Sequence, residues 1–183
     1  MQRLDELIPL LEAELGIATG FFDGLDSDEE NDWSFIIKLH ALVEAAVSHL
    51  LTERVQAPEL SELFARLDMS YKATGKAAYV EALSLLDKPE RRFMCLLSEL
   101  RNKLVHDVRN ITFDLEAHVE GMSKDQRKAF LQNFNLLATE VTDDVRRIFM
   151  HDPRQAMWCS GMAFLGVIYL GSRAPTRIPK SVL

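Results

Sequence analysis

Cysteine is scarce in this sequence, which contains only Cys95 and Cys159 and no CxxC pair. A disulfide-stapled scaffold and a cysteine-ligated zinc module are therefore excluded. The HExxH pattern and the glycine loop of Walker-type phosphate sites are missing too, so we expect no metal and no cofactor. Because both cysteines lie in apolar runs, we expect buried free thiols and a cytoplasmic, reducing location.

Glycine and proline are also few, at eight and six of 183 residues. A turn-rich β-sandwich needs more of both, whereas leucine, alanine and glutamate, which favour helices, are abundant. Hydrophobic residues make up 48% of the chain and charged residues 27%, which is typical of a globular domain. The sequence therefore predicts an all-α fold, an antiparallel bundle of about five to seven helices.

One uncharged apolar run, over 156–170, raises the question of a membrane span. It has 15 residues, and about 20 are needed to cross a bilayer. We favour a buried helix or a subunit contact for it and expect no membrane partner. A membrane-associated segment is the minority alternative, because Arg173, Arg177 and Lys180 follow the run. The N-terminus has no basic region before an apolar core, so we expect no secretory signal.

The spacing of apolar residues predicts a single domain over residues 1–171, followed by a flexible tail over 172–183. We divide the domain into an acidic N-terminal helix and loop (1–31), a helical core (32–150) and an apolar C-terminal helix (153–171). The expected helices cover 2–15, 32–55, 58–75, 77–87, 89–107 and 123–150. We expect a kink or restart at Pro9 in the first helix and a helix stop at Gly75. Residues 16–32 are expected to form a loop and residues 108–115 an extended link.

Local capping signals support several of these boundaries. Asn31 or Asp32 can cap the helix at 32, and Ser123 with Gln126 forms the pattern of a capping box. Asp152-Pro153 separates the last two helices.

Charge is unevenly placed along the chain. The total is −7, yet residues 1–32 contain ten acidic residues and one basic residue, a net of −9. Between Lys88 and Arg109, six basic residues face three acidic ones, a local excess of +3. A polyanion partner is therefore compatible with the acidic total, although the excess is too small to favour a duplex-DNA reader. The acidic N-terminus is a candidate to mask the basic segment.

One acidic stretch, residues 23–32, raises the alternative of a calcium site. It lacks the order of ligands and the central glycine of an EF-hand, so a solvated linker is the favoured interpretation.

The segment from Arg101 to Asp107 carries the clearest chemical signature. It places Arg101, Asn102 and His106 near the end of an apolar helix. Asn102 and His106 are i, i+4 neighbours, but Arg101 and His106 are i, i+5 and lie about 140° apart on a regular helix. Arg101 and His106 can meet only if the helix end is distorted or if two copies pack together, as at a twofold interface.

The chemistry of these side chains suits RNA cleavage without a metal. Arg101 can bind a phosphate in a bidentate manner, and His106 can take a proton from a ribose 2′-OH or give one to the leaving oxygen. Asn102 and Asp107 are supporting candidates, and Lys103 and Arg109 are candidate nucleic-acid contacts. The structural alternative is that the same residues only cap the helix and compensate its dipole.

The string Arg101-Asn102-x-x-x-His106 resembles the R-N-x-x-x-H motif of HEPN domains (higher eukaryotes and prokaryotes nucleotide-binding). A closer resemblance, to the HEPN-like mannitol operon repressor family, covers residues 58–115, about a third of the chain. It rests on Pro58-Glu59-Leu60-Ser61, Ala65-Arg66-Leu67, Tyr71-Lys72-Ala73-Thr74-Gly75, Leu100-Arg101-Asn102-Lys103-Leu104-Val105-His106 and Ile111-Thr112-Phe113.

The HEPN resemblance implies one of two functions. Many HEPN proteins are metal-independent endoribonucleases that act as dimers in toxin–antitoxin, abortive-infection or CRISPR systems, with the residues matching Arg101 and His106 catalytic. The mannitol repressor branch is regulatory and implies a non-catalytic protein that works through protein partners. We therefore expect a homodimer with RNA, a cognate antitoxin or a regulatory protein as partner.

Overall fold

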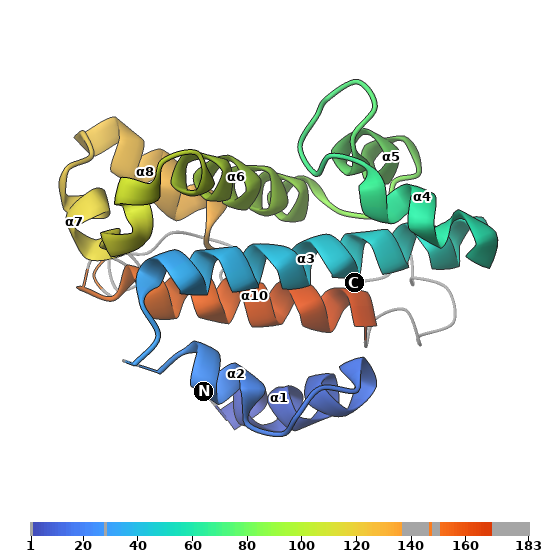
Figure 1. Ribbon diagram of the computed structural model, residues 1–183, viewed down its shortest axis with the longest axis horizontal. Coiled ribbons are helices and arrows are strands. Elements are labelled where there is room, and N and C mark those ends of the chain that lie inside the picture. Colours follow the sequence, from blue (N-terminus) through green and yellow to red (C-terminus); the bar gives the residue numbers. More distant parts are fainter. Residues whose placement is uncertain (1, 28, 137–146, 148–150, 170–183) are drawn as a thin grey trace, which may run out of the picture.

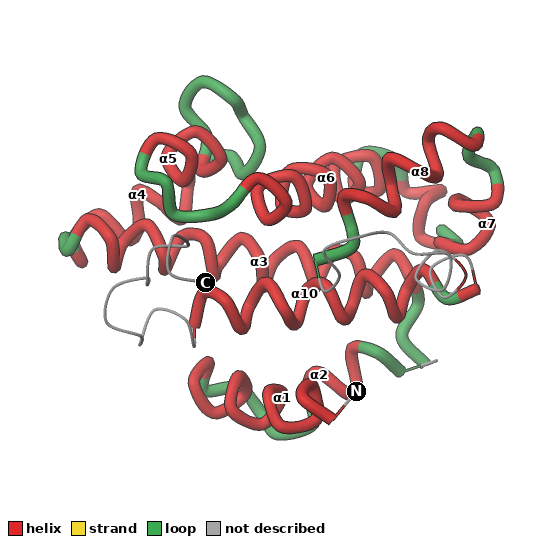
Figure 2. Tube along the Cα trace, turned by 180° about the vertical axis from the view of Figure 1, so that it is seen from behind, coloured by secondary structure: helices red, strands yellow, loops and turns green. Residues whose placement is uncertain are grey.

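The computed structural model describes residues 2–27, 29–136, 147 and 151–169, and these residues form helices and no strands (Figures 1 and 2). The predicted all-α class is confirmed, and five of the described α-helices have ten or more residues. The α-helices are α1 (Gln2–Leu15), α2 (Phe21–Leu25), α3 (Asp32–Val55), α4 (Ser61–Arg66), α5 (Lys76–Ala82), α6 (Lys88–Val105), α7 (Leu115–Glu120), α8 (Lys124–Asn133) and α10 (Pro153–Tyr169), with 3-10 turns η1 (Pro58–Leu60) and η2 (Val108–Thr112).

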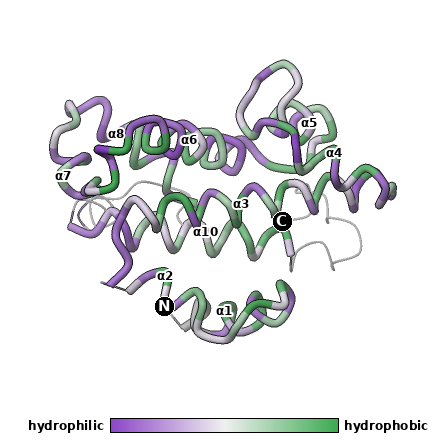
Figure 3. The backbone as a smooth tube through the Cα atoms, viewed as in Figure 1, coloured by the Kyte–Doolittle hydropathy of each residue, from purple (hydrophilic) through white to green (hydrophobic). Residues whose placement is uncertain are grey.

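The described helices lie in three layers, with α3 and α10 packed side by side in the middle (Figure 1). Helix α6 covers one side of α3, and α1 with α2 covers the far side of α10. Hydrophobic residues run along both central helices, whereas the loop leading into α3 is hydrophilic (Figure 3). The acidic N-terminal helices therefore lie across the bundle from α6 and do not cover its basic segment.

The apolar helix α10 belongs to the core, as its composition favoured. Met157, Met162 and Leu165 are fully buried between α3 and α1. Gly161 allows α3 to approach closely, because a Cβ there would lie 2.5 Å from Leu39 Cδ1. Among the described helices, only α3 is long and apolar enough to cross a membrane, and its buried face identifies it as a core helix.

Two segments expected to be irregular, 16–32 and 108–115, contain short helical elements that are stabilised by capping side chains. Within 16–32, the Glu12 carboxylate accepts hydrogen bonds from the Gly20 and Phe22 N–H groups and so supports α2 from ten residues away. Within 108–115, Asp107 caps η2 and Asp114 caps α7. A cap supplied by a distant carboxylate leaves no local pattern in the sequence.

The expected helix over 123–150 is also wrong as a single element. The Ser123–Gln126 capping box is present, but α8 ends at Asn133 and the backbone turns at Phe134. Phe134 packs into the core against Phe93, and its carbonyl accepts a hydrogen bond from the Ser160 hydroxyl of α10. Most of the remaining predicted helix, 137–146 and 148–150, and the predicted tail lie outside the described residues. At α1, by contrast, the helix passes through Pro9 without a restart.

Gly75 does not end the helix that begins near Pro58. That helix stops at Arg66, a loop follows, and Gly75 precedes the first residue of α5. The reason for glycine is a close backbone approach, since a Cβ at this position would lie 2.5 Å from the Tyr71 carbonyl oxygen and 2.7 Å from that of Asp68.

Alanine at Gly75 is expected to destabilise the protein by roughly 1–3 kcal/mol, because the backbone atoms around its Cβ must be displaced. Gly24→Ala is the matched control, since nothing lies within 4 Å of a Cβ there and the residue is helical. We expect that control to be stabilising by up to about 1 kcal/mol. Equal unfolding midpoints in urea for the two variants would contradict the backbone explanation.

Candidate functional site

Helix α6 carries the Arg101–Asp107 segment and is fixed at both ends. At its start, Asp87 and Glu90 form a capping box around Pro89. At its end, the Asn110 side-chain amide donates to the Lys103 carbonyl at 2.9 Å, and Trp33 Nε1 donates to the Leu104 carbonyl at 3.4 Å. These bonds use carbonyls that a helix end otherwise leaves unpaired, so the motif sits on a well-defined helix terminus.

Arg101 faces the core side of α6. At about 100° per residue, it falls within the arc occupied by the buried residues Met94, Leu97 and Leu104. Its side chain is half-buried, and its Nη1 donates to the Asn102 side-chain oxygen at 2.9 Å. The positive charge also acts on His40 of α3, which places Arg101 near the α3–α6 boundary.

His106 lies on another face of the same helix. It is the exposed residue that follows α6, and its own backbone remains in the right-handed helical conformation. The helix end is therefore not distorted, and the separation of about 140° from Arg101 remains. The structure does not bring Arg101 and His106 together within one chain.

The other predicted residues divide between two places. Asp107 and Arg109 bind each other, with 2.6 Å between Arg109 Nη2 and Asp107 Oδ2. Hydrogen bonds from the Arg109 side chain and backbone N–H lower the pKa of the Asp107 carboxyl group. Lys103 instead lines a pocket between α6, α7 and α8.

Exposed apolar side chains lie close to His106 in the sequence. Val105 is 38% exposed, Val108 83% and Ile111 54%, and all three lie at the end of α6 or in η2. We call these three residues the η2 patch. Exposed apolar side chains near one helix end are candidates for a protein interaction site.

A buried polar cluster beside Arg101 was missed by the sequence reasoning. Lys76 is fully buried, and its Nζ lies 2.8 Å from Glu44 Oε1 and 2.8 Å from the Leu67 carbonyl oxygen. His40 is 4% exposed, and its Nδ1 lies 3.8 Å from the other Glu44 oxygen. One signal was available, because His40 and Glu44 interrupt the apolar stripe of α3 at i, i+4 spacing.

The electrostatics of His40 favour its neutral form. Burial lowers the pKa of His40 from 6.5, and the charges of Arg101 and Lys76 lower it further, while Glu44 acts in the opposite direction. Its Nε2 atom is buried and makes no hydrogen bond among the described residues. The cluster near Arg101 therefore contains the Lys76 ammonium group, paired with Glu44, and the neutral imidazole of His40.

No group of His, Cys, Asp and Glu side chains in the described ranges could hold a metal ion. Comparison with known proteins adds no relative: no family model matches the chain, and neither a curated protein nor a solved structure is significantly similar to it. The candidate site thus rests on the residues themselves.

Proposed function

We propose that the protein is an HEPN-like homodimer that cleaves RNA without a metal, with each site shared between two copies. In this arrangement Arg101, held by Asn102, comes from one copy and His106 from the other. The proposal rests on the position of His106, which is exposed, lies between Val105 and Val108 of the η2 patch in the sequence, and is turned away from Arg101 of its own chain. A twofold contact through this patch supplies the second half of each site.

The division of chemical roles follows from the two side chains. The Arg101 guanidinium binds the scissile phosphate and stabilises the charge that develops on it. His106, exposed at the helix end, exchanges protons with the ribose 2′-OH and the leaving 5′-oxygen. Asp107 and Arg109 pair with each other, so we assign neither residue a catalytic role.

Mixing two inactive variants tests the shared site. Arg101→Ala and His106→Ala are each expected to lose RNA cleavage by about 10²-fold or more. Co-refolded mixtures of the two should regain about a quarter of wild-type activity, because half the dimers are mixed and each has one intact site. Cleavage of a labelled RNA by the mixture is the measurement.

Arg66→Ala is the control for loss of a positive charge, since Arg66 is exposed and distant in sequence. It should retain full activity. Activity in either single variant, or failure of the mixture to recover any, would contradict the shared site.

A second candidate is a non-catalytic regulator of the mannitol operon repressor type. The half-buried, inward position of Arg101 favours it, because a phosphate has limited access to a side chain on the core face. In that case the wild-type protein cleaves no RNA, and a protein partner occupies the η2 patch. Val108→Glu should then abolish capture of one stoichiometric partner while leaving the fold intact, since Val108 is 83% exposed.

A further inference from the structure

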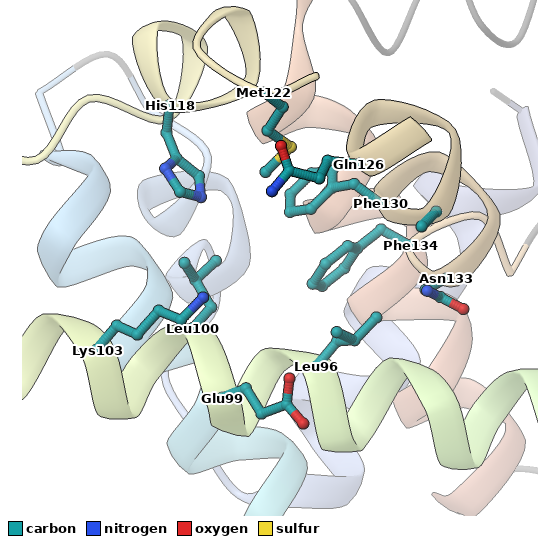
Figure 4. A pocket seen from close by; sticks show the side chains of 11 residues that line it. Leu96, Glu99, Leu100, Lys103, His118, Met122, Gln126, Phe130, Asn133 and Phe134 are labelled. Carbon is teal, nitrogen blue, oxygen red and sulfur yellow. The ribbon is translucent and has the colours of Figure 1, made fainter. Parts of the chain in front are cut away.

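A pocket of about 260 Å³ opens between α6, α7 and α8 (Figure 4). At about 100° per residue, its lining residues on α6 lie on the side of that helix away from Arg101. Its apolar walls are Leu96 and Leu100 of α6 together with Phe130 of α8 and Phe134, the residue that follows α8. Three of these four side chains are buried, so these walls of the pocket belong to the packed core. The volume is just below the roughly 300–1,000 Å³ of pockets for drug-sized ligands, which suits a smaller molecule.

Two nitrogen-bearing side chains stand at one end of this pocket. Figure 4 shows Lys103 extending from α6 and the His118 imidazole descending from α7 toward the same space. Neither side chain makes a hydrogen bond or ion pair among the described residues. Burial lowers the pKa of His118, and the nearby Lys103 charge lowers it further, so the two groups present a net positive end with free donors.

One negative charge also lines the pocket. Glu99 lies one helical turn before Lys103, beside Leu96 and away from His118 (Figure 4). Lys103 and Glu99 do not pair with each other in the described part of the chain. An anion therefore finds attraction at the Lys103–His118 end and repulsion at the Glu99 end, which orients it.

We propose that this pocket binds a small organic carboxylate. Lys103 and His118 hold the carboxylate group, and the aromatic or branched aliphatic body of the ligand lies on Leu100, Phe130 and Phe134. Hydrogen bonds to an ionised group are among the strongest available to a protein, and the apolar walls account for the body of the ligand. The site is separate from Arg101 and His106, and its occupancy does not depend on the RNA chemistry.

Binding of 3-phenylpropionate to the full chain tests the proposal. Calorimetric titration at neutral pH should show saturable 1:1 binding. 3-Phenylpropanol, which lacks the charge, and acetate, which lacks the body, should each bind at least about 10-fold more weakly. Absence of saturable binding, or equal affinity for the alcohol, would overturn the carboxylate assignment.

Variants in the pocket make the test residue-specific. Lys103→Met, which keeps most of the apolar stem, should weaken 3-phenylpropionate binding about 10-fold or more, and Lys88→Met on the same helix should not. Glu99→Gln should tighten binding, an effect that misfolding cannot produce. Unchanged affinity in Lys103→Met, or weaker binding in Glu99→Gln, counts against the proposed orientation.

A bulky side chain provides an independent steric test. Ala129 lines the pocket from α8 and is exposed, so Ala129→Trp should fill the space and abolish binding without unfolding the protein. Ala117→Trp, at an exposed position of α7 outside the pocket lining, is the matched control. Equal binding by both tryptophan variants would place the ligand elsewhere.

Discussion

Replacing Glu44 with alanine is expected to destabilise the protein by about 3–5 kcal/mol, the usual cost of leaving a buried charge without its partner. Lys76 is fully buried, and Glu44 is its only carboxylate among the described residues. Without Glu44, the ammonium group keeps only the carbonyls of Ala65 and Leu67. The free energy of unfolding in urea measures the loss.

Glu62→Ala is the matched control, because Glu62 also pairs with a cation one helical turn away but is 85% exposed. Exposed pairs of this kind contribute about 0–1 kcal/mol. The double variant Glu44→Ala/Lys76→Met should recover much of the lost stability, since the unpaired charge is gone. If the double variant is less stable than Glu44→Ala, packing and not charge explains the role of Glu44.

The second large effect is expected at Arg154, at the start of α10. Its guanidinium donates to the carbonyls of Leu25, Ser27 and Glu30 and lies 3.2 Å from Asp32 Oδ1. Arg154→Ala should destabilise the protein by on the order of 3 kcal/mol, because each lost bond to a charged donor leaves an acceptor unpaired. The link between α2, α3 and α10 is lost with it.

Hydrogen exchange locates this effect. Amide protection in α1 and α2 should fall more than in α6, because Arg154 ties the N-terminal layer to the central one. Arg154→Lys should recover only part of the stability, since an ammonium cannot match a planar fork that donates to four oxygens and also stacks 4.9 Å from the Phe35 ring. Arg66→Ala, which breaks an exposed pair, should change stability by less than about 1 kcal/mol. Uniform loss of protection across the helices would argue against a specific link.

The candidate site shows how far residue spacing can lead. The i, i+5 spacing of Arg101 and His106 already required either a distorted helix end or two copies. The regular helix, capped by Asn110 and Trp33, removes the first option. The regular helix end depends on the hydrogen bond from Trp33, which is 71 residues from Leu104 in the sequence. The motif itself therefore could not predict it.

The charged core shows the opposite case. Lys76 reads as a surface residue in the sequence, since lysine is almost never buried without a partner. Its partner Glu44 is 32 residues away, and the two carbonyls that also accept from Lys76 belong to Ala65 in α4 and to Leu67 just after α4. Only the packing of α4 and α5 onto α3 brings these acceptors to one point.

Local information by itself determined the all-α class, the bounds of α3 and the cap at Ser123, and it narrowed the cap of α3 to Asn31 or Asp32. Turns of a helix and their caps involve residues within four positions of each other. Tertiary structure decided which polar side chains are buried, where α8 ends, and that Arg101 and His106 point apart. Those properties depend on atoms brought together from distant parts of the chain, where a residue's neighbours and not its own type set its exposure and charge.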